Sequence, residues 1–281
     1  MSLDMYEILE IPDSSEAGLQ DLFHEKGWGD GLPMIAPTHE RVEEMLSASQ
    51  GLDPDEVIAS LPPRNGEATR RIIAVNAVMA GCRPEHFPVL VSAIRALSAP
   101  EMNLRGVNAT THCVAPLLIV HGKAARDGNY NSGLGAFGPG NLANAATGRA
   151  VRLTLLHVAG ATPGVGDAST QGSPAKYSYC VAENLDSSPW GGYARTVGID
   201  DESAVTVHCG EAPHNVHDME SSEPSAILDK VASAMTSWGQ NNAPISQGEY
   251  FIALCPEHAA TCAAHGWSLS LIHISEPTRL R

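Results

Sequence analysis

The apolar positions in the first part of the chain follow the period of a helix. Thr38 can cap a helix whose apolar residues fall on one face. The stretch Asp53-Pro54-Asp55-Glu56 combines a capping acid, a proline at the first helical position and a glutamate at the third, and it predicts another helix start. Pro62-Pro63 would end that helix. We therefore expect residues 1–62 to form a helical N-terminal segment that packs on the main domain.

From residue 63 onward, helical patterns alternate with short apolar runs. The patterns predict helices over 67–80, from Pro84, from 141 to about His157, over 224–238 and from Pro256, and extended segments near 105–113, 116–121, 203–208 and 250–254. Helices that alternate with short apolar strands are typical of α/β proteins. Residues 63–268 are therefore predicted to form an α/β domain with a mixed sheet and flanking helices.

The last residues point to a different origin. Residues 269–279 read Leu-Ser-Leu-Ile-His-Ile-Ser-Glu-Pro-Thr-Arg, the peptide that a common transposon-based sequencing adapter encodes when it is read in frame. We therefore expect residues 269–281 to be an adapter translation and the native domain to be truncated after about Ser268. His273 is accordingly not a candidate ligand.

Composition and charge narrow the class of protein. Of the 281 residues, 43 % are hydrophobic and 17 % charged, which is typical of a folded globular chain and not of a disordered one. The formal net charge of −15 would repel nucleic acid and anionic lipid, so neither is an expected partner. The chain has no long apolar run, no secretory signal and no Cys-x-x-Cys motif. It is predicted to be soluble and cytoplasmic, with free thiols.

A glycine-rich loop over residues 131–141 leads into a predicted helix. Exposed backbone N–H groups and the helix dipole make such a junction suited to binding an anion. The loop has neither the dinucleotide-binding nor the phosphate-loop spacing, so the glycines equally fit a role in tight turns and close packing. The candidate anion-binding residues are Ser132, Gly133, Gly138, Gly140 and Asn141.

The pair Lys176-Tyr177 follows a second glycine-rich stretch and predicts one wall of a site. A lysine beside a tyrosine can supply an acid or an electrostatic clamp on a carbonyl or carboxylate group. His112 and His214, on turns after predicted strands, are further candidate catalytic residues, and Cys82 is a candidate thiol beside Arg83. Each residue taken alone also fits an ordinary structural role.

A second histidine and cysteine group allows an alternative. His208, Cys209, His214 and His217 carry imidazole and thiolate groups of the kind that bind zinc or iron. Their spacing matches no established metal motif, so the preferred reading has no metal site. The sequence identifies no cofactor.

Four motifs are distinctive when taken together. They are Gly27-Trp28-Gly29-Asp30-Gly31-Leu32-Pro33, Asn76-Ala77-Val78-Met79-Ala80-Gly81-Cys82-Arg83-Pro84-Glu85, Phe137-Gly138-Pro139-Gly140-Asn141 and Gly210-Glu211-Ala212-Pro213-His214-Asn215. Over about residues 21–268 they resemble a poorly characterised bacterial family that is encoded beside, or fused to, UGSC-motif (seleno)proteins. The resemblance implies thiol- or selenol-linked redox chemistry on a small molecule, with the redox-active motif supplied by the companion. This chain contains no Cys-Gly-Ser-Cys, and Cys209-Gly210-Glu211 is its nearest approach.

Three functions therefore remain open, and an enzyme is the leading one. It would act on a small anionic or carbonyl-bearing molecule, as part of a thiol- or selenol-linked oxidoreductase system with a UGSC-motif partner. The first alternative is a metal-dependent hydrolase or lyase that uses the 208–217 group. The second is a non-catalytic partner subunit of a redox protein. Glycine-rich loops and polar-aromatic clusters favour the enzyme, because they suit pocket walls better than flat docking faces.

Overall fold

The computed structural model describes residues 9–11, 13–199, 203–237, 239 and 249–269. The adapter-like stretch from residue 270 onward lies outside the described residues. The chain forms two units: the first comprises Met1–Glu183 and Asp201–Ala212, and the second comprises Asn184–Asp200 and Pro213–Arg281. The expected boundary at residue 62 does not coincide with the limits of these units and stays a prediction.

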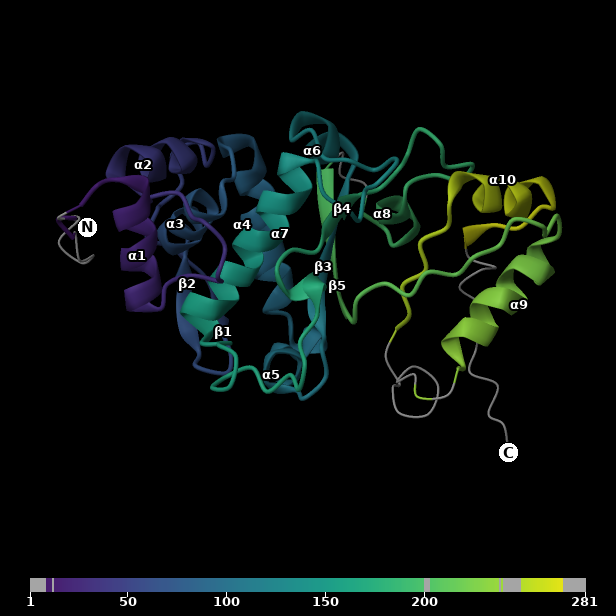
Figure 1. Cartoon of the computed structure of the whole chain (residues 1–281). Coiled ribbons are helices and arrows are strands. Elements are labelled where there is room, and N and C mark those ends of the chain that lie inside the picture. The colour runs from purple at the N-terminus through teal and green to yellow at the C-terminus, as the bar shows by residue number, and fades with distance from the viewer. Residues whose placement is uncertain (1–8, 12, 200–202, 238, 240–248, 270–281) are drawn as a thin grey trace. The chain divides into compact units, whose positions relative to one another are not determined.

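A three-stranded mixed sheet lies beside the main group of helices in the first unit (Figure 1). The central strand β3 (Ala115–His121) pairs in parallel with β4 (Cys180–Ala182) and antiparallel with β5 (Ser203–Gly210). Helices and a sheet with both kinds of pairing confirm the predicted α/β class, and β3 and β5 confirm the predicted strands at 116–121 and 203–208.

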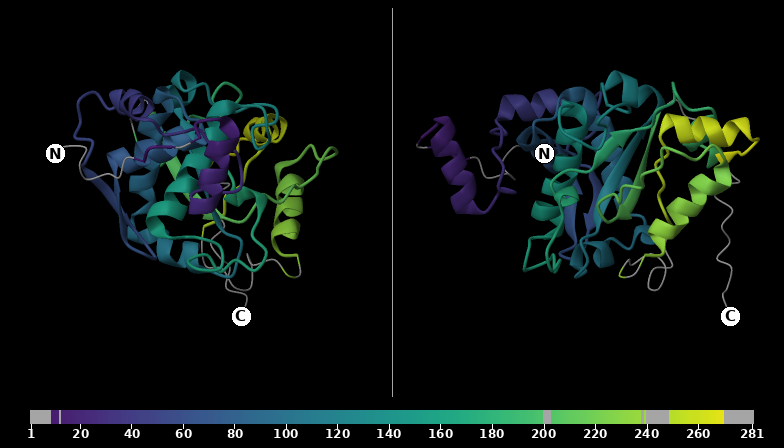
Figure 2. Two further views of the ribbon diagram at one scale, coloured as in Figure 1. Left: turned by 60° about the vertical axis from the view of Figure 1, so that its left-hand side comes forward. Right: turned by 45° about the vertical axis from the view of Figure 1, so that its right-hand side comes forward.

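Helices cover one face of this sheet, as the views in Figures 1 and 2 agree. The helices of the first unit are α1 (Glu16–Lys26), α2 (His39–Ser47), α3 (Arg70–Ala80), α4 (Phe87–Leu97), α5 (Leu104–Ala109), α6 (Gly122–Asp127) and α7 (Leu142–Thr154). Successive side chains of β3 point to opposite faces. Leu118 and Val120 therefore join the main core with α3, α4 and α7, whereas Leu117 and Ile119 join a smaller cluster.

The predicted helix after residue 53 is wrong, because this stretch forms a turn and a strand. The Asp53 carboxylate accepts a hydrogen bond from the Asp55 backbone N–H at 2.9 Å, which closes a turn instead of capping a helix. Strand β1 (Val57–Leu61) follows and pairs antiparallel with β2 (Gly66–Thr69). The acidic residues of the turn then bind arginines at the start of α3: Asp55 contacts Arg71 at 3.2 Å.

Three further boundaries differ from the sequence predictions. The predicted helix over 67–80 divides into β2 and α3, because Thr69 ends the strand and its hydroxyl caps the helix at Ile72 N–H. The predicted extended segment near 105–113 contains α5, which the Asn103 side chain caps at Gly106 N–H. Residues 250–254 form no strand in the part of the chain that the structure describes.

The described part of the second unit contains short helices. They are α8 (Tyr193–Thr196), α9 (Pro224–Met235) and α10 (Pro256–Ala264), the last two confirming the predicted helices there. Ile227 and Cys262 are buried. Among the described helices of both units, none combines the length and the apolar character that a membrane span requires.

Candidate functional site

A large cleft in the first unit is the candidate site. Its volume is about 1490 Å³, and its walls come from α1, the start of α2, α3, the end of α7 and the segment 162–177. Clefts that hold small molecules commonly measure about 300–1,000 Å³ and combine an apolar lining with a few polar groups. This cleft therefore has room for a ligand of substantial size, and the polar groups in its wall decide what it can do.

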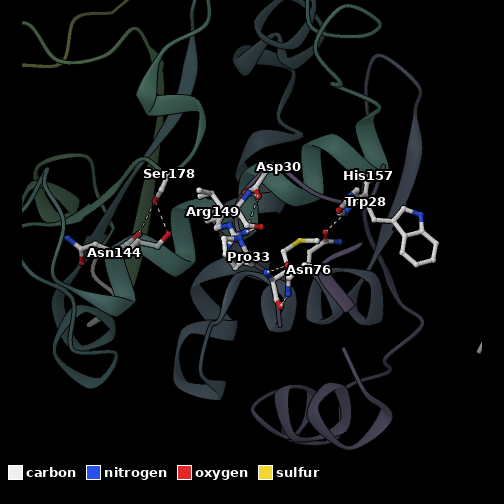
Figure 3. A network of polar contacts seen from close by, with 12 residues as sticks. Trp28, Asp30, Pro33, Asn76, Asn144, Arg149, His157 and Ser178 are labelled. Atoms are coloured by element: carbon white, nitrogen blue, oxygen red, sulfur yellow. Dashed lines mark hydrogen bonds and ion pairs between the residues drawn. The ribbon is translucent and has the colours of Figure 1, made fainter. Parts of the chain in front are cut away.

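Arg149 fastens the glycine-rich loop of residues 27–33 to α7 beside the cleft (Figure 3). Its Nε and Nη2 atoms donate to the Asp30 carboxylate at 2.7 and 2.9 Å, and the same guanidinium reaches the carbonyl oxygens of Pro33 and Leu32 at 3.0 and 3.1 Å. Burial raises the pKa of Asp30, but the bonds and charge of Arg149 outweigh it and hold that pKa below its usual range. A two-pronged pair of this kind fixes direction as well as distance, so it positions the loop.

His157 holds the same loop at a second point. It lies in η4 (Leu155–Ala159), a π-helical turn that continues α7. Its Nδ1 lies 2.6 Å from the Asn76 side-chain oxygen and its Nε2 lies 2.7 Å from the Trp28 carbonyl oxygen (Figure 3). The Asn76 amide nitrogen donates to the Ile72 carbonyl at 2.9 Å, which orients its oxygen towards the ring. Burial lowers the pKa of His157.

A buried carboxylate with two cations forms the polar wall of the cleft. The Asp167 Oδ2 atom lies 2.7 Å from Lys176 Nζ and 2.9 Å from Arg152 Nη2, while its Oδ1 accepts from Ser169 N–H at 2.9 Å. Burial raises the pKa of Asp167, but the bond to Lys176 and the Ser169 N–H outweigh it, so that pKa falls below its usual range. Because Arg152 and Lys176 share a single carboxylate, the cluster keeps one positive charge in excess.

The structure places Lys176 and Tyr177 together in the wall of this cleft. Lys176 ends the short 3-10 turn η5 (Pro174–Lys176), and its ammonium group points to Asp167. Tyr177 follows directly and is 51 % exposed, so its ring is accessible to a ligand. The two residues that the sequence suggested as a site wall thus both line the cleft.

The other candidate catalytic residues lie elsewhere. His112 is exposed and contacts the Thr110 hydroxyl at 3.2 Å; it does not line the cleft, although its carbonyl accepts from the Ser169 hydroxyl at 2.8 Å. His214 is exposed in the second unit. Burial raises the pKa of Cys82 to about 12, which opposes the thiolate that catalysis would need.

Two N–H groups of the predicted anion loop, those of Gly133 and Gly138, are bonded within the loop. The Asn131 side chain accepts from Gly133 N–H at 2.9 Å, the Gly135 carbonyl accepts from Gly138 N–H at 2.8 Å, and the Asn141 side chain caps α7 at Asn144 N–H. The cleft is not lined by the five candidate residues of this loop, Ser132, Gly133, Gly138, Gly140 and Asn141. These bonds show a role of the loop in turns and helix capping, and anion binding by the loop stays a prediction.

The residues of the alternative metal site belong to different units. His208 and Cys209 lie near the end of β5, whereas His214 and His217 follow in the second unit. Among the described residues, no group of three or more His, Cys, Asp or Glu side chains could hold a metal ion. Burial also raises the pKa of Cys209 to about 12.

Sequence reasoning missed Asp167, Asn76 and His157 as site residues. Arg149 and Arg152 are one helical turn apart on α7, and that spacing was the available signal that both would face the same side. It did not reveal their acidic partners, because Asp30 is far away in sequence and Asp167 lies in an irregular segment.

A separate network of side-chain hydrogen bonds connects two strands of the sheet, β3 and β5, and the residue that follows β4. His121, at the end of β3, lies 2.6 Å from the Glu183 carboxylate through Nδ1 and 2.8 Å from the Thr206 hydroxyl through Nε2. These residues do not line the cleft.

Comparison with known proteins supplies no assignment. No family model, no curated protein and no solved structure matches the chain. A function must therefore be argued from the geometry of the cleft.

Proposed function

We propose that the chain is a cytoplasmic bacterial enzyme that acts on a small anionic or carbonyl-bearing molecule in the cleft. The observation that carries this proposal is the cluster of Arg152, Lys176 and Asp167 in the cleft wall. The cluster combines excess positive charge with donors that are already oriented, which is what stabilises charge on a bound oxygen. The six cysteines are free thiols, as is typical of a reducing compartment.

Each residue of the cluster has a distinct role in the proposed reaction. The Asp167 carboxylate orients Lys176 and Arg152 towards the cleft wall. The Lys176 ammonium donates a hydrogen bond to a substrate carbonyl or carboxylate oxygen and stabilises the negative charge that develops there. When the thiol or selenol of the companion loses its proton and adds to the carbonyl carbon, the π electron pair of the C=O bond moves to the oxygen. The Tyr177 hydroxyl, next in the chain and accessible, then donates a proton to that oxygen.

The proposal includes a companion that supplies the redox-active thiol or selenol. The resemblance to the UGSC-associated family suggests this division of labour. It is supported by the state of the buried thiols, since burial raises the pKa of Cys82 and of Cys209 to about 12 and raises that of Cys180 as well. Such thiols stay protonated near neutral pH and are poor nucleophiles.

Turnover by the wild-type chain and by Lys176→Gln tests the assignment. The chain is incubated with a panel of aldehydes, 2-oxo acids and carboxylic esters, with and without a dithiol reductant, and substrate loss is followed by mass spectrometry. Removing one charged donor to the developing oxyanion is expected to lower kcat/KM about 100-fold. Tyr177→Phe is expected to lower kcat more than it changes KM.

Lys123→Gln is the matched control, because this exposed lysine pairs with Asp127 on α6 and lies outside the cleft. Its kcat/KM should equal that of the wild type. Unchanged turnover in both Lys176→Gln and Tyr177→Phe would exclude the proposed roles.

A further inference from the structure

The cleft has both an apolar and a polar lining. Apolar side chains of α1, α3 and η4 remain partly accessible in its wall. They include Leu19, Leu22, Ile72, Val75 and Leu156. The polar lining includes the Asp167 cluster and Arg64. A ligand that fills the cleft is therefore expected to carry both an apolar body and a polar head.

The polar lining favours an anionic head. Arg64 donates to the His157 carbonyl at 3.3 Å, and Arg152 donates to the Ala161 carbonyl at 3.1 Å, so both guanidinium groups reach the same short segment 157–161. Among the described residues, Arg64 has no carboxylate partner. Its charge adds to the excess charge of the Arg152, Lys176 and Asp167 cluster.

Ser173 also lines the cleft. Its hydroxyl oxygen is buried and has no hydrogen-bond partner among the described residues. An unsatisfied buried hydroxyl is costly. The local excess of positive charge is notable in a chain whose formal net charge is −15.

We infer that the cleft takes an amphipathic carboxylic acid, with its carboxylate between Arg64 and the Arg152–Lys176 pair and its aliphatic or aromatic body against α1, α3 and η4. This inference rests on the proposed function and narrows it, since it excludes small hydrophilic acids as the preferred substrates. Apolar contact contributes about 0.8 kcal/mol for each buried CH₂ group, which makes chain length a sensitive readout.

Isothermal titration of the full chain with three probes tests the inference. Decanoate has both parts, acetate has only the head, and decanol has only the body. Decanoate is expected to bind at least tenfold more tightly than either of the others.

Two variants distinguish the polar from the apolar lining of the cleft. Arg64→Gln is expected to weaken decanoate about tenfold and to leave decanol unchanged, because it removes a positive charge and leaves the apolar lining intact. Leu22→Gln is expected to weaken decanoate and decanol alike, by about threefold. Arg95→Gln and Leu52→Gln, at exposed positions outside the cleft, are the matched controls and should bind as the wild type does.

The outcomes distinguish the inference from the proposed function. Equal affinity for acetate and decanoate would overturn the amphipathic ligand and leave a small anionic substrate in place. Equal weakening of decanoate by Arg64→Gln and Arg95→Gln would overturn the placement of the head. If neither acid binds, the inference fails, and the proposed function fails too if the panel of carbonyl compounds also shows no turnover.

Discussion

At the residue scale, burial fixes the protonation state of His86. The residue is 2 % exposed; its Nδ1 accepts from Arg83 N–H at 3.1 Å, so Nε2 carries the proton donated to the Gly128 carbonyl at 3.2 Å. Burial lowers the pKa of His86. A second proton would be placed on Nδ1 and would remove the bond from Arg83. The ring is therefore neutral in the native protein near neutral pH.

This lowered pKa gives the stability a defined pH dependence. Below the ordinary histidine pKa of about 6.5 the unfolded state takes up a proton before the native state does. The stabilisation that comes from keeping the ring neutral is therefore complete above about pH 6.5 and is lost as the pH falls through the native pKa. We expect the free energy of unfolding to fall less between pH 7.5 and 5 in His86→Gln than in the wild type. Urea titrations at both pH values measure it, and an identical decrease would contradict the assignment.

The Asp30–Arg149 pair illustrates a contact that the sequence alone could not predict. Local signals were readable: the Thr38 side chain does accept from Arg41 N–H and caps α2. The partner of Arg149 is on a loop more than a hundred residues away, and no period or motif connects the two. Lys176 and Tyr177 could be proposed because they are adjacent, but the acid that orients Lys176 could not.

Arg149→Lys tests whether the paired geometry or only the charge matters. Lysine keeps the charge but cannot make parallel bonds to Asp30 while also reaching the carbonyl of Pro33. We expect a loss of about 1–2 kcal/mol in the free energy of unfolding and a change in Trp28 fluorescence, since the loop carries that indole. A variant with wild-type stability and fluorescence would show that charge alone is sufficient.

At the element scale, Gly148 lets α7 approach the backbone that leads into β4. A Cβ atom at this position would lie 2.5 Å from the Tyr179 nitrogen and 2.4 Å from the Ser178 hydroxyl oxygen. Alanine would improve helix propensity by about 0.8–1 kcal/mol. The clash with backbone costs more, because overpacking typically destabilises by about 1–3 kcal/mol and the backbone cannot rotate away.

We therefore expect Gly148→Ala to lower the free energy of unfolding by about 1 kcal/mol despite its better propensity. Chemical denaturation measures the change. Gly191→Ala is the control, because a Cβ there meets nothing within 4 Å, and its effect should stay within about 0.5 kcal/mol. An increase in stability in Gly148→Ala would mean that α7 can move away from the backbone that leads into β4 at little cost.

The prediction of helices and strands failed where the same local sequence fits two structures. An acidic residue before a proline starts a helix in one context and closes a turn in another, and the choice is made at a distance: Arg70 and Arg71 bind the acids of the turn. The same holds for α5, where Asn103 adopts a positive φ of 44° that no apolar pattern announces. The central strand was predictable because β3 is a nearly continuous apolar run.

At the scale of the whole molecule, the two units differ in how much core they contain. The first has a main core that includes α3, α4, α7 and β3, whereas the described part of the second buries few side chains. Local stability follows buried apolar contacts.

Hydrogen exchange should therefore separate the units. We expect the backbone amides of α7 and β3 to exchange at least tenfold more slowly than those of α9, as measured by mass spectrometry of peptides from the intact chain. Equal protection of α7 and α9 would contradict this order.

The π-helical turn η4 also sets the direction in which His157 points. Such a turn holds one residue more than a regular helical turn, and neighbouring residues of an α-helix are about 100° apart around its axis. A chain one residue shorter before His157 would continue α7 regularly and direct the imidazole away from Asn76 and Trp28. The contact between helix and loop therefore depends on the number of residues in this turn as well as on their identity.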